Sequence, residues 1–90
     1  MVYVIYILRF QNNGLYIGQT NNLQQRLKDH KNKTDRSSKF SRENGDFKLV
    51  YTEKYETQLE IMRREKQLKG WTRAKKEALI SGKLELLKKL

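Results

Sequence analysis

The sequence predicts a small mixed α/β fold of the α+β type, in which helices flank a three-stranded antiparallel sheet in the order β-β-α-β-α-α. Two strand-like runs at the start are separated by a tight-turn signal, Asn12-Asn13-Gly14, which indicates a hairpin. A third strand-like run precedes two segments that begin with helix-capping threonines. Because the 90 residues hold no proline and no repeat, we expect one domain over residues 1–90.

The strands are predicted from side-chain type and alternation. Residues 2–10 (VYVIYILRF) are β-branched and aromatic, and their apolar character on both faces favours a central strand. Residues 15–18 read as the second strand of the hairpin. Residues 47–53 (FKLVYTE) alternate between apolar and polar side chains, as a third strand should.

The first helix is predicted to begin after Asn21 or Asn22, since asparagine is a good N-cap, and to run to about His30. Leu23 and Leu27 would lie on its buried side because they are four residues apart.

Capping signals also bound the two later helices. Thr57 and Glu60 form a capping box at the start of a helix that Gly70 can end. Thr72 can cap another short helix that runs to about Ser81.

The charge balance predicts the partner class. Twenty Lys and Arg against ten Asp and Glu give a net charge of +10, which favours a polyanion: DNA is expected, with RNA as an alternative. The absence of cysteine excludes disulfides, thiolate metal sites and cysteine nucleophiles. No apolar run approaches the roughly 20 residues of a membrane helix. We therefore expect a soluble cytoplasmic protein that does not bind membranes, monomeric or pairing only on its substrate.

Basic side chains are concentrated after the first helix, in the polar segment 31–44, which is predicted to be a loop. Such side chains contact phosphates and carry little sequence information, and Phe40 could stack on an unpaired base. The structural alternative is an ordinary solvated surface. The candidate nucleic-acid-binding residues are Lys28, Lys31, Lys33, Arg36, Lys39, Phe40, Arg42 and Arg63.

One carboxylate is predicted to face the core. Ile61, Met62 and Leu68 define an inward stripe on the second helix, and Glu65 falls on that stripe by its spacing. A buried carboxylate is costly unless something compensates it. By spacing alone, an ion pair with Arg26 is favoured over a metal ion.

The hairpin turn decides whether two tyrosines share a face of the sheet. A two-residue turn would place Tyr6 and Tyr16 on opposite faces. A three-residue turn over residues 12–14, with Gly14 in the left-handed region, would pair Phe10 with Tyr16 on the face of Tyr6. A shared tyrosine site therefore requires this turn or an equivalent bulge.

The two tyrosines lie in tripeptides that resemble the signature of the GIY-YIG nuclease superfamily. Val4-Ile5-Tyr6 is followed ten residues later by Tyr16-Ile17-Gly18. Val4 stands where the first tripeptide of the family has glycine.

The resemblance continues over nearly the whole chain. In QTNNLQQRL, Arg26 falls where the family places its catalytic arginine, and His30 follows one turn later. In MRREKQLK, Glu65 stands where the family keeps its metal-binding glutamate. The sequence is most like the small stand-alone, single-domain branch, whose relatives include homing endonucleases and the nuclease half of an excision-repair subunit.

The resemblance implies a metal-dependent endonuclease that hydrolyses DNA phosphodiester bonds, with single-stranded or branched DNA as the candidate preference. Glu65 would hold one Mg²⁺ or Mn²⁺, without an organic cofactor. Arg26 would neutralise the scissile phosphate. Tyr6 or Tyr16 would accept the proton of the attacking water, if cations lower its pKa, and His30 would assist proton transfer or orient a tyrosine. A non-catalytic nucleic-acid-binding module on the same fold is the alternative.

Overall fold

A computed structural model of the chain describes residues 2–32 and 46–83. Its sheet has the strand order β2-β1-β3, and both pairings are antiparallel. The strands are β1 (Tyr3–Phe10), β2 (Leu15–Thr20) and β3 (Phe47–Tyr55). The helices are α1 (Leu23–Asn32), α3 (Gln58–Lys69) and α4 (Arg73–Ser81). The predicted fold class and element order are confirmed, although β2 and β3 each extend two residues further than expected.

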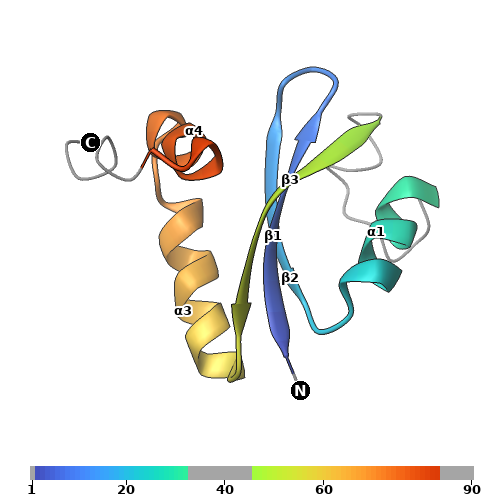
Figure 1. The fold of residues 1–90 in the computed structure, drawn as a ribbon, viewed down its shortest axis with the longest axis vertical. Helices are drawn as coiled ribbons and strands as arrows, with labels where there is room; N and C mark the ends of the chain where they lie inside the picture. Colours follow the sequence, from blue (N-terminus) through green and yellow to red (C-terminus); the bar gives the residue numbers. More distant parts are fainter. Residues whose placement is uncertain (1, 33–45, 84–90) are drawn as a thin grey trace.

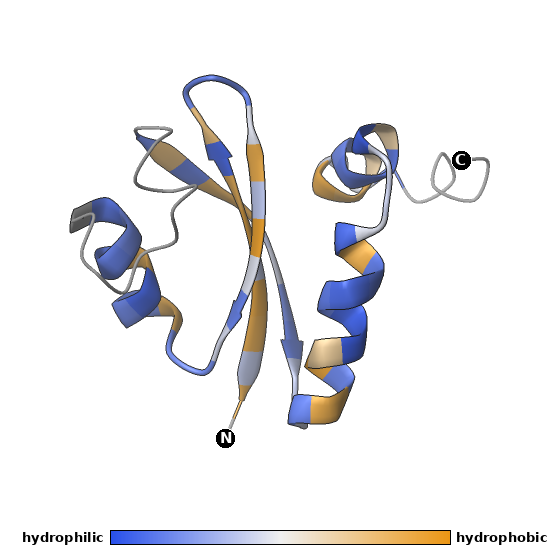
Figure 2. Cartoon of the chain, turned by 180° about the vertical axis from the view of Figure 1, so that it is seen from behind, coloured by the Kyte–Doolittle hydropathy of each residue, from blue (hydrophilic) through white to orange (hydrophobic). Residues whose placement is uncertain are grey.

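The sheet is covered on both faces, by α1 on one side and by α3 and α4 on the other (Figure 1). Tyr6 and Leu8 of β1 pack with the α1 side, whereas Ile5 and Ile7 pack with α3 and α4, and all four are fully buried. In Figure 2, hydrophobic residues are prominent on β1, while α1 and α3 are largely hydrophilic. The sequence of β1 is apolar on both faces for this reason.

The hairpin turn preserves the expected parity but differs from the predicted turn. Phe10 pairs with Gly14, whose carbonyl accepts from the Phe10 amide at 2.9 Å, and Tyr16 pairs with Leu8. The left-handed residue is Asn13, with φ 68°, rather than Gly14. The prediction of Phe10 opposite Tyr16 was therefore wrong, because the three-residue loop lies one position earlier. Asparagine tolerates the left-handed region better than most residues.

The predicted helix starts are confirmed. Asn22 caps α1, since its Oδ1 accepts from the Gln25 amide at 3.2 Å. Thr57 Oγ1 accepts from the Glu60 amide at 3.2 Å. Thr72 caps α4 in the same way.

The inward stripe of α3 is narrower than predicted. Ile61 and Leu68 are fully buried, but Met62 is 51% exposed, so its assignment to the stripe was wrong. Met62 is one residue, or about 100°, from Ile61 around the helix, which turns it away from the sheet.

A polar cluster joins the hairpin turn to α4, and we call it the hairpin latch: Arg9, Asn13, Arg73 and Glu77. Arg9 donates to Asn13 Oδ1 at 2.9 Å and pairs with the Glu77 carboxylate. Arg73 donates to the Asn13 carbonyl and lies 3.3 Å from Glu77 Oε2. The turn and the last described helix are thereby held together.

Among the described helices, none is long and apolar enough to cross a membrane. The segment predicted as a loop after α1 lies mostly in residues 33–45, which, like residues 84–90, lie outside the described residues. Lys31, placed in that loop by the sequence, belongs to the last turn of α1.

A candidate active site beside the outer strand

Three predicted site residues meet between α1 and the sheet. The Tyr6 hydroxyl lies 2.9 Å from His30 Nε2 and accepts a hydrogen bond from Arg26 Nε at 3.3 Å. Arg26 and His30 are one helical turn apart, so both reach the same tyrosine from α1. Tyr6 and His30 are fully buried, whereas Arg26 is partly exposed.

Tyr16 completes this group, which we call the tyrosine cluster: Tyr6, Tyr16, Arg26 and His30. The Tyr16 ring centroid lies 6.2 Å from that of Tyr6 and 5.3 Å from that of His30. Tyr16 is partly exposed. The prediction that the two tyrosines share one face of the sheet is confirmed by the pairing of Leu8 with Tyr16.

Gly18 leaves the space that the Tyr6 ring occupies. Gly18 pairs with Tyr6, and a Cβ at Gly18 would lie 2.5 Å from the Tyr6 hydroxyl oxygen and 2.6 Å from its Cζ. Val4, which replaces the first signature glycine, is buried at 8% exposure. The second signature glycine, Gly18, is thus sterically required. At the position of the first signature glycine, β1 accommodates the side chain of Val4.

Burial makes the Tyr6 hydroxyl a weaker acid than that of an ordinary tyrosine. It raises the pKa of Tyr6 to about 12, and the hydrogen bond from Arg26 offsets only part of the rise. The sequence-based interpretation required nearby cations to lower a tyrosine pKa, and for Tyr6 that requirement is not met. Tyr6 therefore stays protonated at neutral pH and can donate to His30.

Burial also keeps His30 neutral. Burial first, and then the Arg26 charge, lower the pKa of His30 to about 4, against an opposing effect of Asp29. Of the two roles predicted for His30, assistance in proton transfer would require an imidazole that titrates near neutral pH, which this pKa does not provide. A neutral His30 can accept from Tyr6 at Nε2, which favours an orienting role.

The lowered pKa of His30 predicts how the stability of the fold depends on pH. The pKa of His30 falls from 6.5 to about 4 on folding, so the folded state favours the neutral imidazole. The contribution of His30 to the free energy of unfolding is therefore fully present above pH 6.5 and is lost as the pH falls toward 4. Between pH 7 and 4 we expect wild type to lose roughly 2–3 kcal/mol more than a His30→Gln variant. Urea unfolding of both proteins across this pH range measures the difference. The carboxylates titrate in the same range but are common to both proteins, so their effect cancels in the difference. Parallel curves for the two proteins would contradict the assignment.

Glu65 lies on the opposite side of the sheet from the tyrosine cluster. It belongs to α3, and its Oε1 lies 3.5 Å from Gln19 Nε2 and 3.6 Å from Lys69 Nζ. The option of an ion pair between Glu65 and Arg26 was therefore wrong, because α1 and α3 cover different faces (Figure 1). Glu65 is also only partly buried, with 19% of its side chain exposed.

The donor chemistry at Glu65 fits a single hard divalent cation. A partly exposed carboxylate can give one oxygen ligand, and Mg²⁺ keeps several waters in sites of this kind. Within residues 2–32 and 46–83, no three His, Cys, Asp or Glu side chains gather as a ligand set. Glu65 would therefore be the protein ligand, with water and phosphate oxygens as the others.

A second polar cluster on the α3 face was missed by the sequence reasoning, and we call it the Glu53 clamp. Arg64 donates from Nε and from a terminal nitrogen to the two oxygens of Glu53, both at 2.9 Å. Tyr51 and Tyr55 donate to the same carboxylate at 2.5 and 2.8 Å. Burial alone would raise the pKa of Glu53, but these hydrogen bonds, that of Arg64 first, lower it below its usual value.

The Glu53 clamp fixes α3 against β3. Arg64 also lies over the Trp71 ring, 5.2 Å from its centroid, so one side chain joins the sheet, α3 and the link between α3 and α4. The alternation of Tyr51, Glu53 and Tyr55 was the available signal, since residues two apart share a face.

The candidate nucleic-acid-binding residues are only partly covered by the structure. Lys28 and Lys31 are exposed on α1, and Arg63 is exposed on α3. The candidates Lys33, Arg36, Lys39, Phe40 and Arg42 lie outside the described residues.

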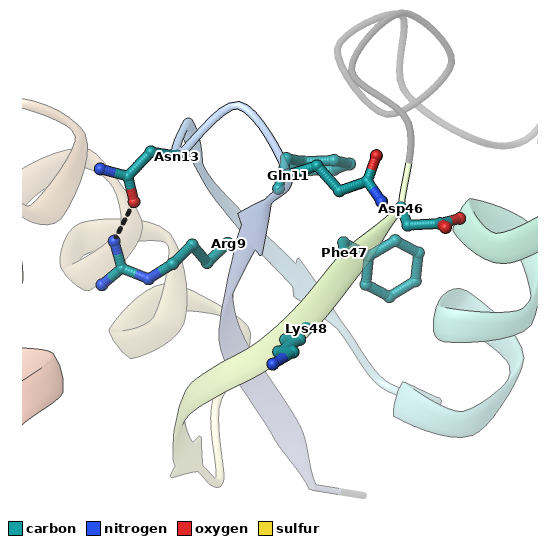
Figure 3. Close-up of a pocket in the computed structure, with 7 residues that line it drawn as sticks. Arg9, Gln11, Asn13, Asp46, Phe47 and Lys48 are labelled. Atoms are coloured by element: carbon teal, nitrogen blue, oxygen red, sulfur yellow. Dashed lines mark hydrogen bonds between the residues drawn. The ribbon is translucent and has the colours of Figure 1, made fainter.

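A surface pocket of about 520 Å³ lies at the hairpin end, and the residues that line it include neither Tyr6 nor Glu65 (Figure 3). Arg9, Asn13 and Lys48 line it, and Phe10 and Phe47 pack together there with ring centroids 5.7 Å apart. The hydrogen bond from Arg9 to Asn13 crosses one side of it (Figure 3). Because Arg9 is already paired with Glu77, we do not assign the candidate site to this pocket.

Comparison with known proteins identifies the fold family. A family model described as the GIY-YIG catalytic domain matches residues 2–78. The chain belongs to the GIY-YIG family. GIY-YIG domains form a nuclease family, and the matched span includes every member of the tyrosine cluster as well as Glu65.

The GIY-YIG relatives are small proteins of similar length. The chain is 43% identical over 79 residues to a UPF0213 protein of Clostridium perfringens, covering 88% of this chain and 83% of the relative. It is 38% identical over 76 residues to a UPF0213 protein of Oceanobacillus iheyensis, covering 84% and 86% respectively. The expected membership of the stand-alone GIY-YIG branch is thereby confirmed.

A solved structure supports the GIY-YIG fold. The solution NMR structure of a UPF0213 protein from Bacillus halodurans matches with a TM-score of 0.59 and 34% sequence identity. The match covers 90% of this chain and 84% of that one.

Proposed function

We propose that this protein is a metal-dependent endonuclease that hydrolyses DNA phosphodiester bonds at the edge formed by β2. The observation that carries the proposal is the Tyr6 hydroxyl, which is held between Arg26 Nε at 3.3 Å and His30 Nε2 at 2.9 Å. A nuclease needs a cationic side chain in a fixed orientation next to the scissile phosphate. In the tyrosine cluster this cation is Arg26, which the buried Tyr6 hydroxyl holds in a fixed orientation.

The edge position of β2 lets residues from both faces serve one phosphate. Tyr16 points to the α1 side, and Gln19, which contacts Glu65, points to the α3 side of the same outer strand. A phosphodiester bound along this strand could meet Arg26 from one face and Glu65 from the other. We propose single-stranded or branched DNA as the preferred form, because the phosphate backbone of the DNA must be accessible if it is to lie along the exposed edge of β2.

Each member of the tyrosine cluster has a distinct proposed role. Arg26 binds the non-bridging oxygens, with the orientation of its guanidinium fixed by Tyr6. Tyr6 remains protonated and positions Arg26, since burial raises its pKa to about 12. We assign the acceptance of the water proton to Tyr16, which is partly exposed, and the orientation of Tyr6 to the buried His30.

Glu65 would hold the divalent cation, Mg²⁺ or Mn²⁺. When bound, the cation supplies charge neutralisation at the phosphate and lowers the pKa of a coordinated water. The contribution of the chain is an oxygen ligand kept partly exposed on α3, which the Glu53 clamp fixes to the sheet.

The proposal is tested by incubating the purified protein with labelled single-stranded, double-stranded and branched DNA, and with RNA. Each substrate is used with Mg²⁺, Mn²⁺ or a chelator. We expect cleavage with either metal, none with chelator, and a loss of at least about 100-fold in Glu65→Gln. Equal cleavage by wild type and Glu65→Gln would show that the activity is a contaminant or uses another site.

A non-catalytic nucleic-acid-binding module is the second candidate, and the raised pKa of Tyr6 supports it to the extent that it removes one of the two candidate bases. Binding of DNA without cleavage, weakened steeply by salt, would support it.

A further inference from the structure

Both contacts that the described residues make with Glu65 fall on the same oxygen. Gln19 Nε2 and Lys69 Nζ approach Oε1 at 3.5 and 3.6 Å. Gln19 comes from β2 and is neutral, whereas Lys69 comes from the next turn of α3 and is cationic. The two neighbours thus differ in whether they would compete with a bound cation.

The pair formed by Glu65 and Lys69 is of a kind that is easily broken. Its geometry is i,i+4 on a helix surface, and 55% of the Lys69 side chain is exposed. Exposed pairs of this type are weak, because water and salt screen them and the lysine side chain is flexible. A doubly charged ion can therefore displace the ammonium group without a change in the fold.

We propose that Lys69 is the resident counter-ion of Glu65 and is displaced when a divalent cation binds, while Gln19 holds the carboxylate in place against β2. The inference rests on the proposed function, because that function makes Glu65 the metal ligand. Lys69 and Gln19 are positioning residues here, and their effects on metal affinity have opposite signs. Removing the competing charge strengthens metal binding, and removing the neutral donor weakens it.

Titration of the metal-free protein with Mn²⁺, followed by the electron paramagnetic resonance signal of unbound Mn²⁺, tests this without DNA or catalysis. Lys69→Met is expected to bind Mn²⁺ about three- to tenfold more tightly than wild type. Gln19→Leu is expected to bind at least about threefold more weakly. Lys66→Met, the same substitution at an exposed position of α3, should change the affinity by less than about twofold. Circular dichroism checks that each variant is folded.

The outcomes separate this inference from the proposed function. If Glu65→Gln abolishes Mn²⁺ binding but Lys69→Met and Lys66→Met behave alike, the counter-ion role of Lys69 is overturned and the metal site stands. A Gln19→Leu variant with wild-type affinity would overturn the role of Gln19. If Glu65→Gln binds Mn²⁺ like wild type, Glu65 is not the ligand, and both the inference and the metal part of the proposed function are wrong.

Discussion

Replacing Arg26 with lysine is expected to reduce DNA cleavage by roughly 1000-fold. Lysine keeps the charge but loses the planar fork and the Nε donor that binds the Tyr6 hydroxyl at 3.3 Å. The phosphate would then be held by a flexible point charge instead of an oriented group. Single-turnover cleavage rates at saturating protein measure the effect, and Mn²⁺ binding should be unchanged because Glu65 lies across the sheet from Arg26.

Arg73→Lys is the matched control for Arg26→Lys. Arg73 belongs to the hairpin latch, where it contacts the Asn13 carbonyl and Glu77, and a lysine there keeps a cation beside the carboxylate. Its cleavage rate should stay within about threefold of wild type, as expected for an exposed ion pair. A similar loss in both variants, or full activity of Arg26→Lys, would place phosphate binding elsewhere.

Replacing Gly18 with alanine is expected to destabilise the fold by about 2 kcal/mol and to lower cleavage at least tenfold. The new Cβ would lie 2.5 Å from the Tyr6 hydroxyl oxygen, 2.6 Å from Tyr6 Cζ and 3.0 Å from Tyr16 Cε1. Tyr6 is fully buried and bound to Arg26 and His30, so its ring cannot retreat without breaking those contacts. Chemical denaturation and cleavage rates measure the two effects.

Gly70→Ala tests whether the loss of a glycine is harmful in general. The nearest atoms to a Cβ at Gly70 are carbonyl oxygens at 3.5 and 3.7 Å, and its φ is −82°, so alanine should be tolerated. In a Tyr6→Leu background, Gly18→Ala should cost less than it does in wild type, because the clashing atoms are gone. Additive costs for Gly18→Ala and Tyr6→Leu would show that Gly18 acts through something other than the Tyr6 ring.

Much of the fold could be predicted because local chemistry determines it. The caps Thr57 and Thr72 mark the starts of α3 and α4, and the two apolar faces of β1 indicate a strand between two layers of helices. The exact turn could not be predicted, because Asn13 and Gly14 both tolerate left-handed backbone and the choice depends on contacts with α4.

The candidate site was predictable in its residue types but not in its electrostatics. Spacing placed Arg26 and His30 on one helix face, and the structure brings both to Tyr6. The shifts in the pKa of Tyr6 and His30 arise from complete burial, which depends on how α1 packs against the sheet. The contact between Glu65 and Gln19 was missed because it joins α3 to a strand 46 residues earlier in the sequence.

The hairpin latch has a consequence for how the chain folds. Arg9 and Glu77 are 68 residues apart, so their ion pair closes a loop that contains β2, α1, β3 and α3. The hairpin is local and can form early, but the contact that secures its turn must wait until α4 has docked. During synthesis on the ribosome, the first two strands would therefore emerge long before α4, and the contacts that secure the turn between them form only once α4 has been added.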